Sequence, residues 1–118
     1  MPTILLVEDD SDVRTLIEAA LLERGVEVRL AGDDRAAYRI LDREAAQIAV
    51  VITDIALGAG TTGFDVARRA KRLNPRMEVI YITGHSLKMD RLGVEGGVMF
   101  PKPFNLEDLV DMALAMAR

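Results

Sequence analysis

The chain has 118 residues, a length that suits one domain with a single hydrophobic core. Half of the residues are hydrophobic and 29% are charged, a balance that argues against disorder, and no apolar run approaches the ~20 residues that a membrane helix needs. The formal net charge of −4 argues against direct nucleic-acid binding, and the absence of cysteine together with a single histidine excludes thiolate and histidine-rich metal sites.

These features also set expectations about location and ligands. We expect a cytoplasmic protein with no membrane association, because the N-terminus lacks a basic segment followed by an apolar one. Any metal is expected on oxygen ligands, because carboxylates and carbonyls are the donors that remain. No linker, repeat or low-complexity segment is present, so we expect one domain over residues 1–118 without an attached output domain.

The N-terminal segments predict a strand, a helix and a second strand. An apolar run at Thr3–Val7, bounded by Pro2 and an acidic cluster, favours a strand that is buried on both faces. Apolar residues then recur at helical spacing over Asp12–Arg24, and Gly25 follows as a C-cap, so this segment predicts an amphipathic helix. Val26–Ala31 alternates apolar and charged residues, which indicates a strand nearer the edge of a sheet.

The middle of the chain repeats this pattern. Asp33 or Asp34 is expected to cap a helix that carries Ala36, Ala37, Ile40 and Leu41 on one side. Ile48–Thr53 is the most continuous β-type run and predicts the central strand. A glycine-rich loop then leads to a helix from about Phe64 to Leu73.

The C-terminal part predicts two more strands and a clear last helix. Glu78–Thr83 indicates a fourth strand and Gly97–Phe100 a short fifth. Between them Leu87–Leu92 allows about two helical turns, but neighbouring glycines weaken the signal for this fourth helix. Asn105 is expected to cap the fifth helix, with Asp108 at its third position.

Strands that alternate with helices predict a doubly wound α/β fold, a five-stranded parallel sheet with helices on both faces. Ligands of such sheets bind at the carboxyl ends of the strands. The residues at or shortly after the ends of the predicted strands are therefore the candidates for chemistry, and they comprise Glu8, Asp9, Asp10, Asp54, Thr83 and Lys102. Carboxylates that converge in this way repel one another unless a cation lies among them, and Mg²⁺ is the divalent cation that prefers such oxygen ligands.

The same residues suit phosphoryl transfer. Asp54 is expected to be the nucleophile and phosphoacceptor, forming an acyl phosphate. Mg²⁺, Lys102 and the Thr83 hydroxyl would each neutralise or bind one phosphoryl oxygen. The predicted site therefore combines an acidic metal site with a cationic and a hydroxyl contact for phosphate.

Four motifs resemble those of bacterial response-regulator receiver domains, and their order and spacing cover the whole chain: Glu8-Asp9, Asp54, Thr83-Gly84 and Lys102-Pro103-Phe104. The resemblance implies a flavodoxin-like sheet of strand order 2-1-3-4-5. It implies Mg²⁺, or Mn²⁺ in its place, on Asp9, Asp54 and the main-chain carbonyl of Ala56, with Glu8 acting mainly through water. It also implies a cis peptide bond between Lys102 and Pro103.

The resemblance further implies a stand-alone receiver of a two-component system. Asp54 would accept the phosphoryl group from a histidine kinase or a histidine phosphotransfer protein. The domain would be a switch and not a conventional enzyme, although it would assist its own phosphorylation and slow autodephosphorylation. A downstream protein target, unknown from the sequence, would read the face formed by the fourth helix, fifth strand and fifth helix, and a homodimer through that face stays open.

Three departures from the family pattern concern the switch. Met99 stands where the family usually has an aromatic residue, three positions before Lys102, and it has no phenolic hydroxyl. The loop after Asp54 lacks the usual Met-Pro turn, and the fourth helix is short and glycine-rich. These departures keep open a receiver-like interaction module whose partner binding does not depend on phosphate.

Two other functions fit the residues poorly. Gly58, Gly60 and Gly63 have the spacing of a dinucleotide-binding fingerprint, but the first glycine lies several residues beyond the strand, so the turn is not tight. A hydrolase of the haloacid dehalogenase type needs a second acid two residues after its nucleophile, where this chain has Ala56.

Overall fold

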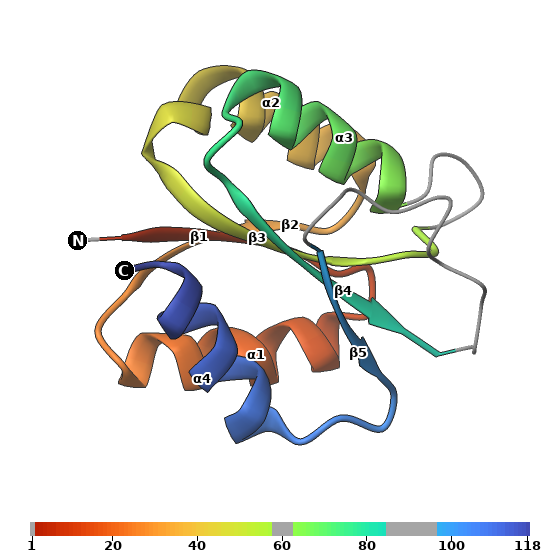
Figure 1. Ribbon diagram of the computed structural model, residues 1–118. Coiled ribbons are helices and arrows are strands. Elements are labelled where there is room, and N and C mark those ends of the chain that lie inside the picture. The colour runs from red at the N-terminus through yellow and green to blue at the C-terminus, as the bar shows by residue number, and fades with distance from the viewer. Residues whose placement is uncertain (1, 58–62, 85–96) are drawn as a thin grey trace.

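The computed structural model describes residues 2–57, 63–84 and 97–118 (Figure 1). The elements in this part of the chain are β1 (Thr3–Val7), α1 (Ser11–Glu23), β2 (Glu27–Ala31), α2 (Asp34–Glu44), the 3₁₀ turn η1 (Ala45–Gln47), β3 (Ile48–Asp54), α3 (Gly63–Leu73), β4 (Glu78–Thr83), β5 (Val98–Pro101) and α4 (Leu106–Met116). The α4 of the structure is the fifth helix of the sequence prediction. The predicted fourth helix at Leu87–Leu92 lies outside the described residues.

The five strands form one parallel sheet in the order β2-β1-β3-β4-β5. This confirms the doubly wound fold and its strand order. The continuous apolar run of β3 occupies the centre, and the alternating sequence of β2 occupies an edge, as their patterns predicted. The order reverses direction between β1 and β3, which is where ligands of such sheets bind.

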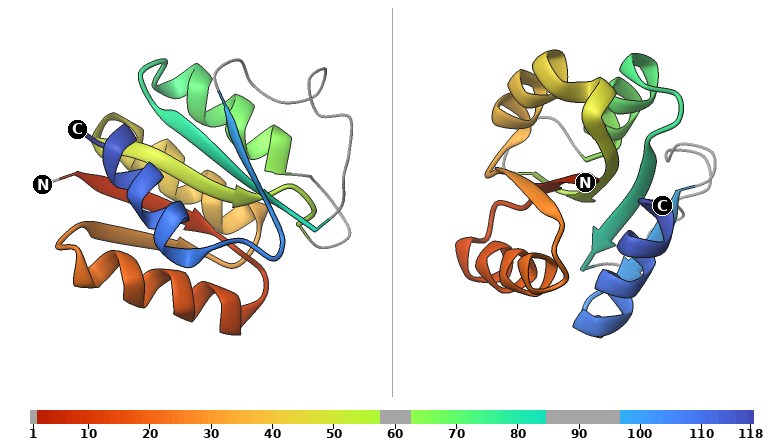
Figure 2. Two further views of the ribbon diagram at one scale, coloured as in Figure 1. Left: turned by 60° about the horizontal axis from the view of Figure 1, so that its bottom comes forward. Right: turned by 90° about the vertical axis from the view of Figure 1, so that its left-hand side faces the viewer.

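Helices cover both faces of the sheet, with α2 and α3 on one face and α1 and α4 on the other (Figures 1 and 2). Two hydrophobic clusters fill these layers, because successive strand residues point to opposite faces. Leu5 and Val7 of β1 belong to the cluster under α2 and α3, while Ile4 and Leu6 belong to the cluster over α1 and α4. All of these four side chains are fully buried, which explains why β1 is apolar at every position.

Side-chain caps define where the helices begin. The Asp33 carboxylate accepts a hydrogen bond from the backbone N–H of Ala36, which decides between the two caps that the sequence allowed for α2. Asn105 caps α4 through the backbone N–H of Asp108, as predicted. The start of α1 was predicted at Asp12, but Asp10 is the cap, and its carboxylate accepts from the backbone N–H groups two and three residues on.

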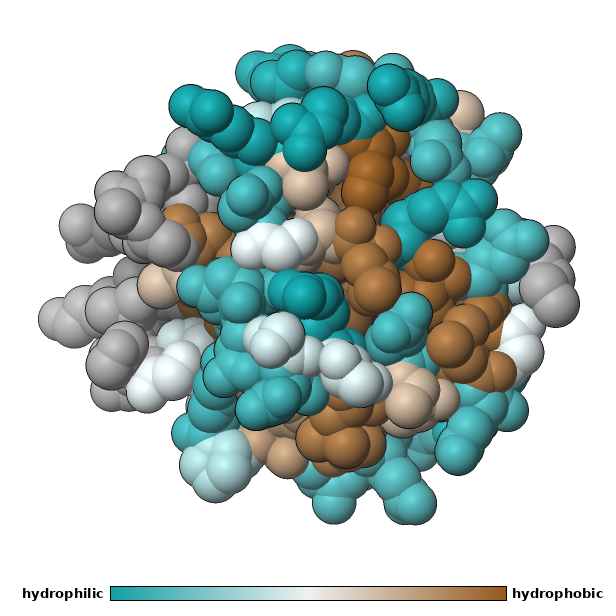
Figure 3. Space-filling view, turned by 180° about the vertical axis from the view of Figure 1, so that it is seen from behind, coloured by the Kyte–Doolittle hydropathy of each residue, from teal (hydrophilic) through white to brown (hydrophobic). Residues whose placement is uncertain are grey.

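Apolar side chains contribute to part of the surface. On the face seen from behind in Figure 3, a hydrophobic band crosses between hydrophilic regions. Among the described residues, the large apolar side chains with the most exposure are Leu16, Leu22, Leu30 and Leu73. Within residues 2–57, 63–84 and 97–118, no helix is long and apolar enough to cross a bilayer.

Candidate functional site

The parallel register of the sheet brings the ends of four strands to one edge. Val7 at the end of β1 pairs with Thr53, one residue before Asp54 of β3. Asp54 in turn pairs with Ile82 of β4, and Thr83 pairs with the last residue of β5. Because the strands are parallel and nearly in register, the residues that follow them converge at this edge, which is the topological reason for the site.

Three carboxylates meet there. One oxygen from each of Glu8, Asp9 and Asp54 lies within 4.8 Å of the other two. The side chain of Glu8 has no exposed surface and Asp54 is 5% exposed, whereas Asp9 is exposed to solvent. The structure therefore assembles the predicted acidic cluster, with two of its members buried and one accessible.

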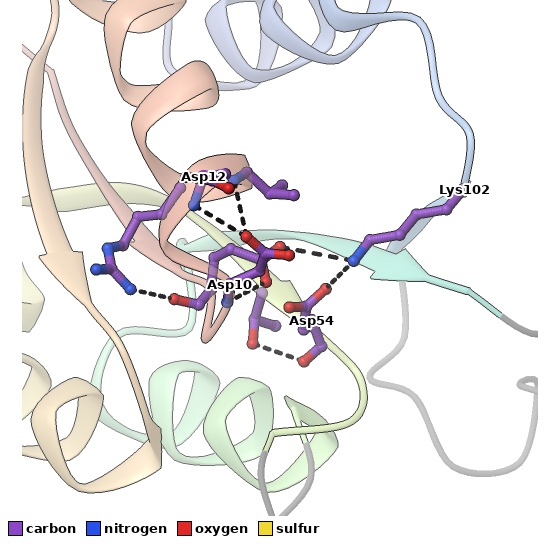
Figure 4. Close-up of polar contacts among 8 residues, drawn as sticks. Asp10, Asp12, Asp54 and Lys102 are labelled. Carbon is purple, nitrogen blue, oxygen red and sulfur yellow. Dashed lines mark hydrogen bonds and ion pairs between the residues drawn. The ribbon is translucent and has the colours of Figure 1, made fainter.

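Lys102 brings a positive charge to this cluster (Figure 4). Its Nζ lies 3.4 Å from Oδ1 of Asp54 and 3.8 Å from Oε1 of Glu8. The backbone N–H of Lys102 donates to the carbonyl of Thr83 over 2.7 Å, which ties the lysine to the end of β4. The peptide bond between Lys102 and Pro103 is cis, the isomer that the family resemblance implied.

The electrostatics of the pair Glu8 and Asp54 reflect two acids that share a buried space. Burial raises the pKa of Glu8 to about 8, and the neighbouring Asp54 carboxylate adds to that rise. Burial also raises the pKa of Asp54, although Glu8 and Lys102 act in the opposite direction. Burial would lower the pKa of Lys102, but the negative charges of Asp54 and Glu8 outweigh it, and the net shift is upward. The raised pKa of Glu8 favours its protonated form near neutral pH in the metal-free protein.

The donor set fits a hard divalent cation. Oε1 of Glu8 is buried and accepts no hydrogen bond from the described residues, so it has coordination capacity left. A divalent cation would favour the ionised form of both carboxylates, and oxygen ligands of this kind suit Mg²⁺ or Mn²⁺. The residues present therefore agree with the metal site that the sequence predicted.

A pocket of about 200 Å³ opens beside these carboxylates. It is lined by Asp9, Asp54, Ile55, Ala56, Ile82, Thr83, Gly84 and Lys102. The pocket thus brings together two of the acids with the predicted threonine, lysine and Ala56. Glu8 is fully buried and does not line the pocket. Its carboxyl group interacts with Asp54 and Lys102, two residues that do line it.

The predicted site positions Asp10 and Met99 also lie outside the pocket: Asp10 caps α1, and Met99 lies on β5. Met99 pairs with Tyr81 across β4 and β5 and packs against the hydrophobic cluster under α2 and α3. Tyr81 itself contacts Phe64, with ring centroids 5.1 Å apart. Met99 is therefore a packing residue behind the pocket.

Two residues near the site were not assigned to it by sequence reasoning. Gly63 begins α3, and a Cβ built on it would lie 1.7 Å from the carbonyl oxygen of Asp54. Arg14, in the first turns of α1, donates from Nη1 to the carbonyl oxygen of Glu8 over 2.8 Å. In the sequence, Gly63 was noticed only as part of a glycine pattern that resembles a dinucleotide-binding fingerprint. Arg14 showed no signal other than its place in a predicted helix.

Comparisons with known proteins bear on this site. A family model described as "Response regulator receiver domain" matches residues 4–114. The response regulator receiver protein CpdR of Brucella abortus is 33% identical over 114 residues, which cover 94% of this chain and 92% of CpdR. The DNA-binding transcriptional regulator NtrC of a Bradyrhizobium strain is 32% identical over 111 residues, which cover 92% of this chain but 22% of NtrC.

Solved structures agree with the family match. A response regulator receiver protein from Sinorhizobium medicae superposes with a TM-score of 0.88 at 31% identity, covering 99% of this chain and 97% of that one. The receiver domain of the hybrid histidine kinase CckA superposes with a TM-score of 0.84 at 27% identity, covering 98% of this chain and 99% of that one. Fold and sequence therefore point to the same family over nearly the whole chain.

Proposed function

This chain belongs to the response regulator receiver domain family, and from that membership we propose that it is a phosphoacceptor switch in a two-component system, with Asp54 as the phosphorylated residue. The observation that carries the proposal is the setting of Asp54. Its carboxylate is buried at the floor of a pocket, shares a cluster with Glu8 and Asp9, and lies 3.4 Å from the Lys102 ammonium.

The transfer step follows from that setting. An oxygen of the Asp54 carboxylate attacks the phosphorus of a phosphohistidine on a histidine kinase or phosphotransfer protein. The new P–O bond forms as the P–N bond breaks, and the electron pair of that bond returns to the donor imidazole. The product on this chain is an acyl phosphate. Lys102 lies near enough to Asp54 to pair with a phosphoryl oxygen, and the Thr83 hydroxyl lines the same pocket.

A divalent cation would be held by Asp9, Asp54 and the main-chain carbonyl of Ala56, with Glu8 acting through water. When bound, Mg²⁺ supplies positive charge that offsets the negative charge of the phosphoryl oxygens. The chain's own residues orient and surround the reacting carboxylate. Slow autodephosphorylation reverses the modification: water attacks the phosphorus, the bond to Asp54 breaks, and inorganic phosphate leaves with the carboxylate regenerated.

The phosphoryl group would act on partner binding through Thr83 and the neighbouring β5–α4 surface. Thr83 pairs with Pro101 of β5, and its carbonyl accepts from the backbone N–H of Lys102. A shift of Thr83 toward the phosphoryl group would therefore pull on β5 and the connection to α4. The downstream partner is a protein that distinguishes the two arrangements of this face, which is also the face for a homodimer.

Asp54→Asn tests the assignment of the phosphoacceptor. We expect the wild-type protein to gain one phosphoryl group from a small phosphodonor such as acetyl phosphate, only when Mg²⁺ is present, and the variant to gain none. The variant should stay folded, because the substitution removes a carboxylate whose burial already raises its pKa. Intact mass followed by peptide mapping measures the adduct, and thermal unfolding checks the fold.

Asp34→Asn is the matched control, because Asp34 lies in the first turn of α2 and not in the pocket. It should be labelled like the wild type. An adduct that persists on Asp54→Asn contradicts the assignment of Asp54. A wild type that binds Mg²⁺ but forms no adduct contradicts phosphoryl acceptance and favours a phosphate-independent interaction module, for which Met99 at the usual aromatic position would be the supporting feature.

A further inference from the structure

We propose that Arg14 is a positioning residue for the metal site and that Gly32 leaves the space in which its guanidinium lies. This inference rests on the proposed function, because it concerns the same cluster of Glu8, Asp9 and Asp54. It adds a residue from α1 and one from the β2–α2 connection to the parts of the fold on which Mg²⁺ binding depends.

The contact that carries the inference joins Arg14 to the backbone of Glu8. Nη1 of Arg14 donates to the carbonyl oxygen of Glu8 over 2.8 Å. Arg14 is partly buried, and it forms no ion pair with any carboxylate in residues 2–57, 63–84 and 97–118. Arg14 is thus a charged donor that is partly removed from water and bonds to one backbone carbonyl. We infer that its role is to hold this carbonyl in place.

The carbonyl in question belongs to the peptide bond between Glu8 and Asp9. Its orientation sets the directions in which both side chains leave the backbone. The backbone N–H of Glu8 donates to the carbonyl of Ala31 over 3.0 Å, so one side of Glu8 is already fixed to the end of β2. Arg14 fixes the carbonyl on the other side of Glu8. The two contacts together prevent rotation of the segment that carries two of the three clustered acids.

Gly32 follows β2 directly and faces the same guanidinium. A Cβ built on Gly32 would lie 3.2 Å from Nη1 of Arg14, which is closer than an ordinary van der Waals contact. The backbone of Gly32 does not adopt a positive φ, since Gly25 is the residue with that conformation in the described part of the chain. A side chain at position 32 would therefore crowd the guanidinium of Arg14 in its present position. A branched side chain there would displace the guanidinium from Glu8 without altering any acid.

An electrostatic role and a positioning role of Arg14 predict opposite effects of its removal on Mg²⁺ affinity. If Arg14 acted only through its positive charge, its removal would tighten Mg²⁺ binding, because a nearby cation repels the metal. If it holds the Glu8–Asp9 peptide, its removal weakens Mg²⁺ binding, as is typical when a partner that orients metal ligands is lost. The sign of the change therefore separates a positioning role from an electrostatic one.

The experiment is a calorimetric titration of the metal-free protein with MgCl₂. We expect Arg14→Ala to weaken Mg²⁺ binding about tenfold, and Arg14→Lys to recover part of that loss because lysine retains a charged donor. Gly32→Val should weaken binding in the same direction. Adding Gly32→Val to Arg14→Ala should cause no further loss, because the two substitutions break one contact.

Arg24→Ala is the matched control, since Arg24 also lies at α1 but pairs with Asp111 of α4. It should bind Mg²⁺ as the wild type does. Thermal unfolding of each metal-free variant identifies any that fails to fold. At saturating Mg²⁺, the Arg14→Ala protein should regain adduct formation from a small phosphodonor, because its Asp54, Thr83 and Lys102 are intact.

The inference is overturned if Arg14→Ala binds Mg²⁺ as tightly as the wild type or more tightly. A full additional loss in the double variant also overturns it, because independent effects add. Both readings use the metal alone and no phosphodonor. A wild type that binds Mg²⁺ yet forms no adduct would therefore contradict the proposed function and leave the test of Arg14 interpretable.

Discussion

Glu8 is the residue at this site with the least access to water. Its side chain has no exposed surface, and Oε1 accepts no hydrogen bond from the described residues. A buried charge costs stability unless it is paired, and the Lys102 ammonium at 3.8 Å is a distant partner. A glutamate in this position is hard to explain by stability. A bound cation, as proposed above, would explain it, because a cation favours further negative charge behind Asp54.

Lys102→Ala tests the role of the ammonium. The substitution removes the positive charge 3.4 Å from Asp54, on the side that would face a phosphoryl oxygen. We expect adduct formation from a small phosphodonor to slow about 100-fold, the scale of losing one charge-stabilising donor. Mg²⁺ affinity should be retained or increased, because all three carboxylates remain and a cation that repels the metal is lost. Intact mass over time and calorimetric titration measure the two quantities.

Lys71→Ala serves as the comparison for that experiment. Lys71 lies in the last turn of α3, and its ammonium contacts the carbonyl of Pro75, outside the pocket. Its loss should change neither rate nor metal affinity. Adduct formation by Lys102→Ala at the wild-type rate would show that the ammonium does not take part in transfer.

At the scale of elements, the position of Asp54 depends on the contact between the end of β3 and the start of α3. The backbone N–H of Gly63 donates to the carbonyl of Ile55, and the N–H of Ile55 donates to the carbonyl of Ile82. The Thr53 hydroxyl donates to the carbonyl of Asp54 over 2.9 Å. The start of α3 therefore packs directly on the peptide that carries the phosphoacceptor. This close approach requires a residue without a side chain.

Gly63→Ala tests this close approach. A Cβ at position 63 would lie 1.7 Å from the carbonyl oxygen of Asp54, so α3 and the end of β3 must separate. We expect a loss of about 1–3 kcal/mol in the free energy of unfolding, as for overpacked sites, together with slower adduct formation on Asp54. Urea unfolding and intact mass measure these effects.

Gly84→Ala is the control for stability, because no atom lies within 4 Å of a Cβ built at position 84. It should change the free energy of unfolding by about 0.5 kcal/mol or less. If Gly63→Ala is as stable as Gly84→Ala, α3 does not pack on the Asp54 peptide as closely as described.

For the whole molecule, the buried acids make folding depend on pH and on metal. The pKa of Glu8 rises from 4.5 to about 8 on folding, so between these values the folded state holds a proton that the unfolded chain has released. Stability falls with pH wherever the folded state binds more protons. The metal-free protein should therefore lose stability as pH rises from about 5 to 8. A bound cation removes this loss because it takes the place of the proton.

Chemical unfolding at several pH values, with EDTA and with MgCl₂, checks this expectation. At about 100 times its Kd, Mg²⁺ should add about 2.7 kcal/mol to the free energy of unfolding. The gain at a fixed Mg²⁺ concentration should be larger at pH 8 than at pH 6, since the ligands must be deprotonated. Glu8→Gln should flatten the pH dependence of the metal-free protein. A metal-free wild type that becomes more stable between pH 5 and 8 would contradict the raised pKa of Glu8.

Much of the fold was predictable because its signals are local. The buried strands are apolar at successive positions, and the helices show apolar residues at helical spacing, so five strands and the helices α1, α2, α3 and α4 were found within a few residues of their ends. The helix α1 was predicted to start at Asp12, one residue late, because the periodicity of apolar residues does not show that Asp10 is the cap. The strand order came from the resemblance of the motifs to a family.

The sequence by itself determined which residues could meet, because parallel strands end at a common edge. Glu8, Asp9, Asp54, Thr83 and Lys102 all lie at or directly after the end of a strand. Only the tertiary structure decided how they meet. The burial of Glu8 and the position of the Lys102 ammonium between two acids depend on segments distant in sequence. The contact of Arg14 with the Glu8 carbonyl and the approach of Gly63 to Asp54 join residues nearer in sequence, but they depend on how α1 and α3 pack on the strands. Periodicity and composition describe neighbours along the chain, whereas these contacts depend on how the packed layers bring separate elements together.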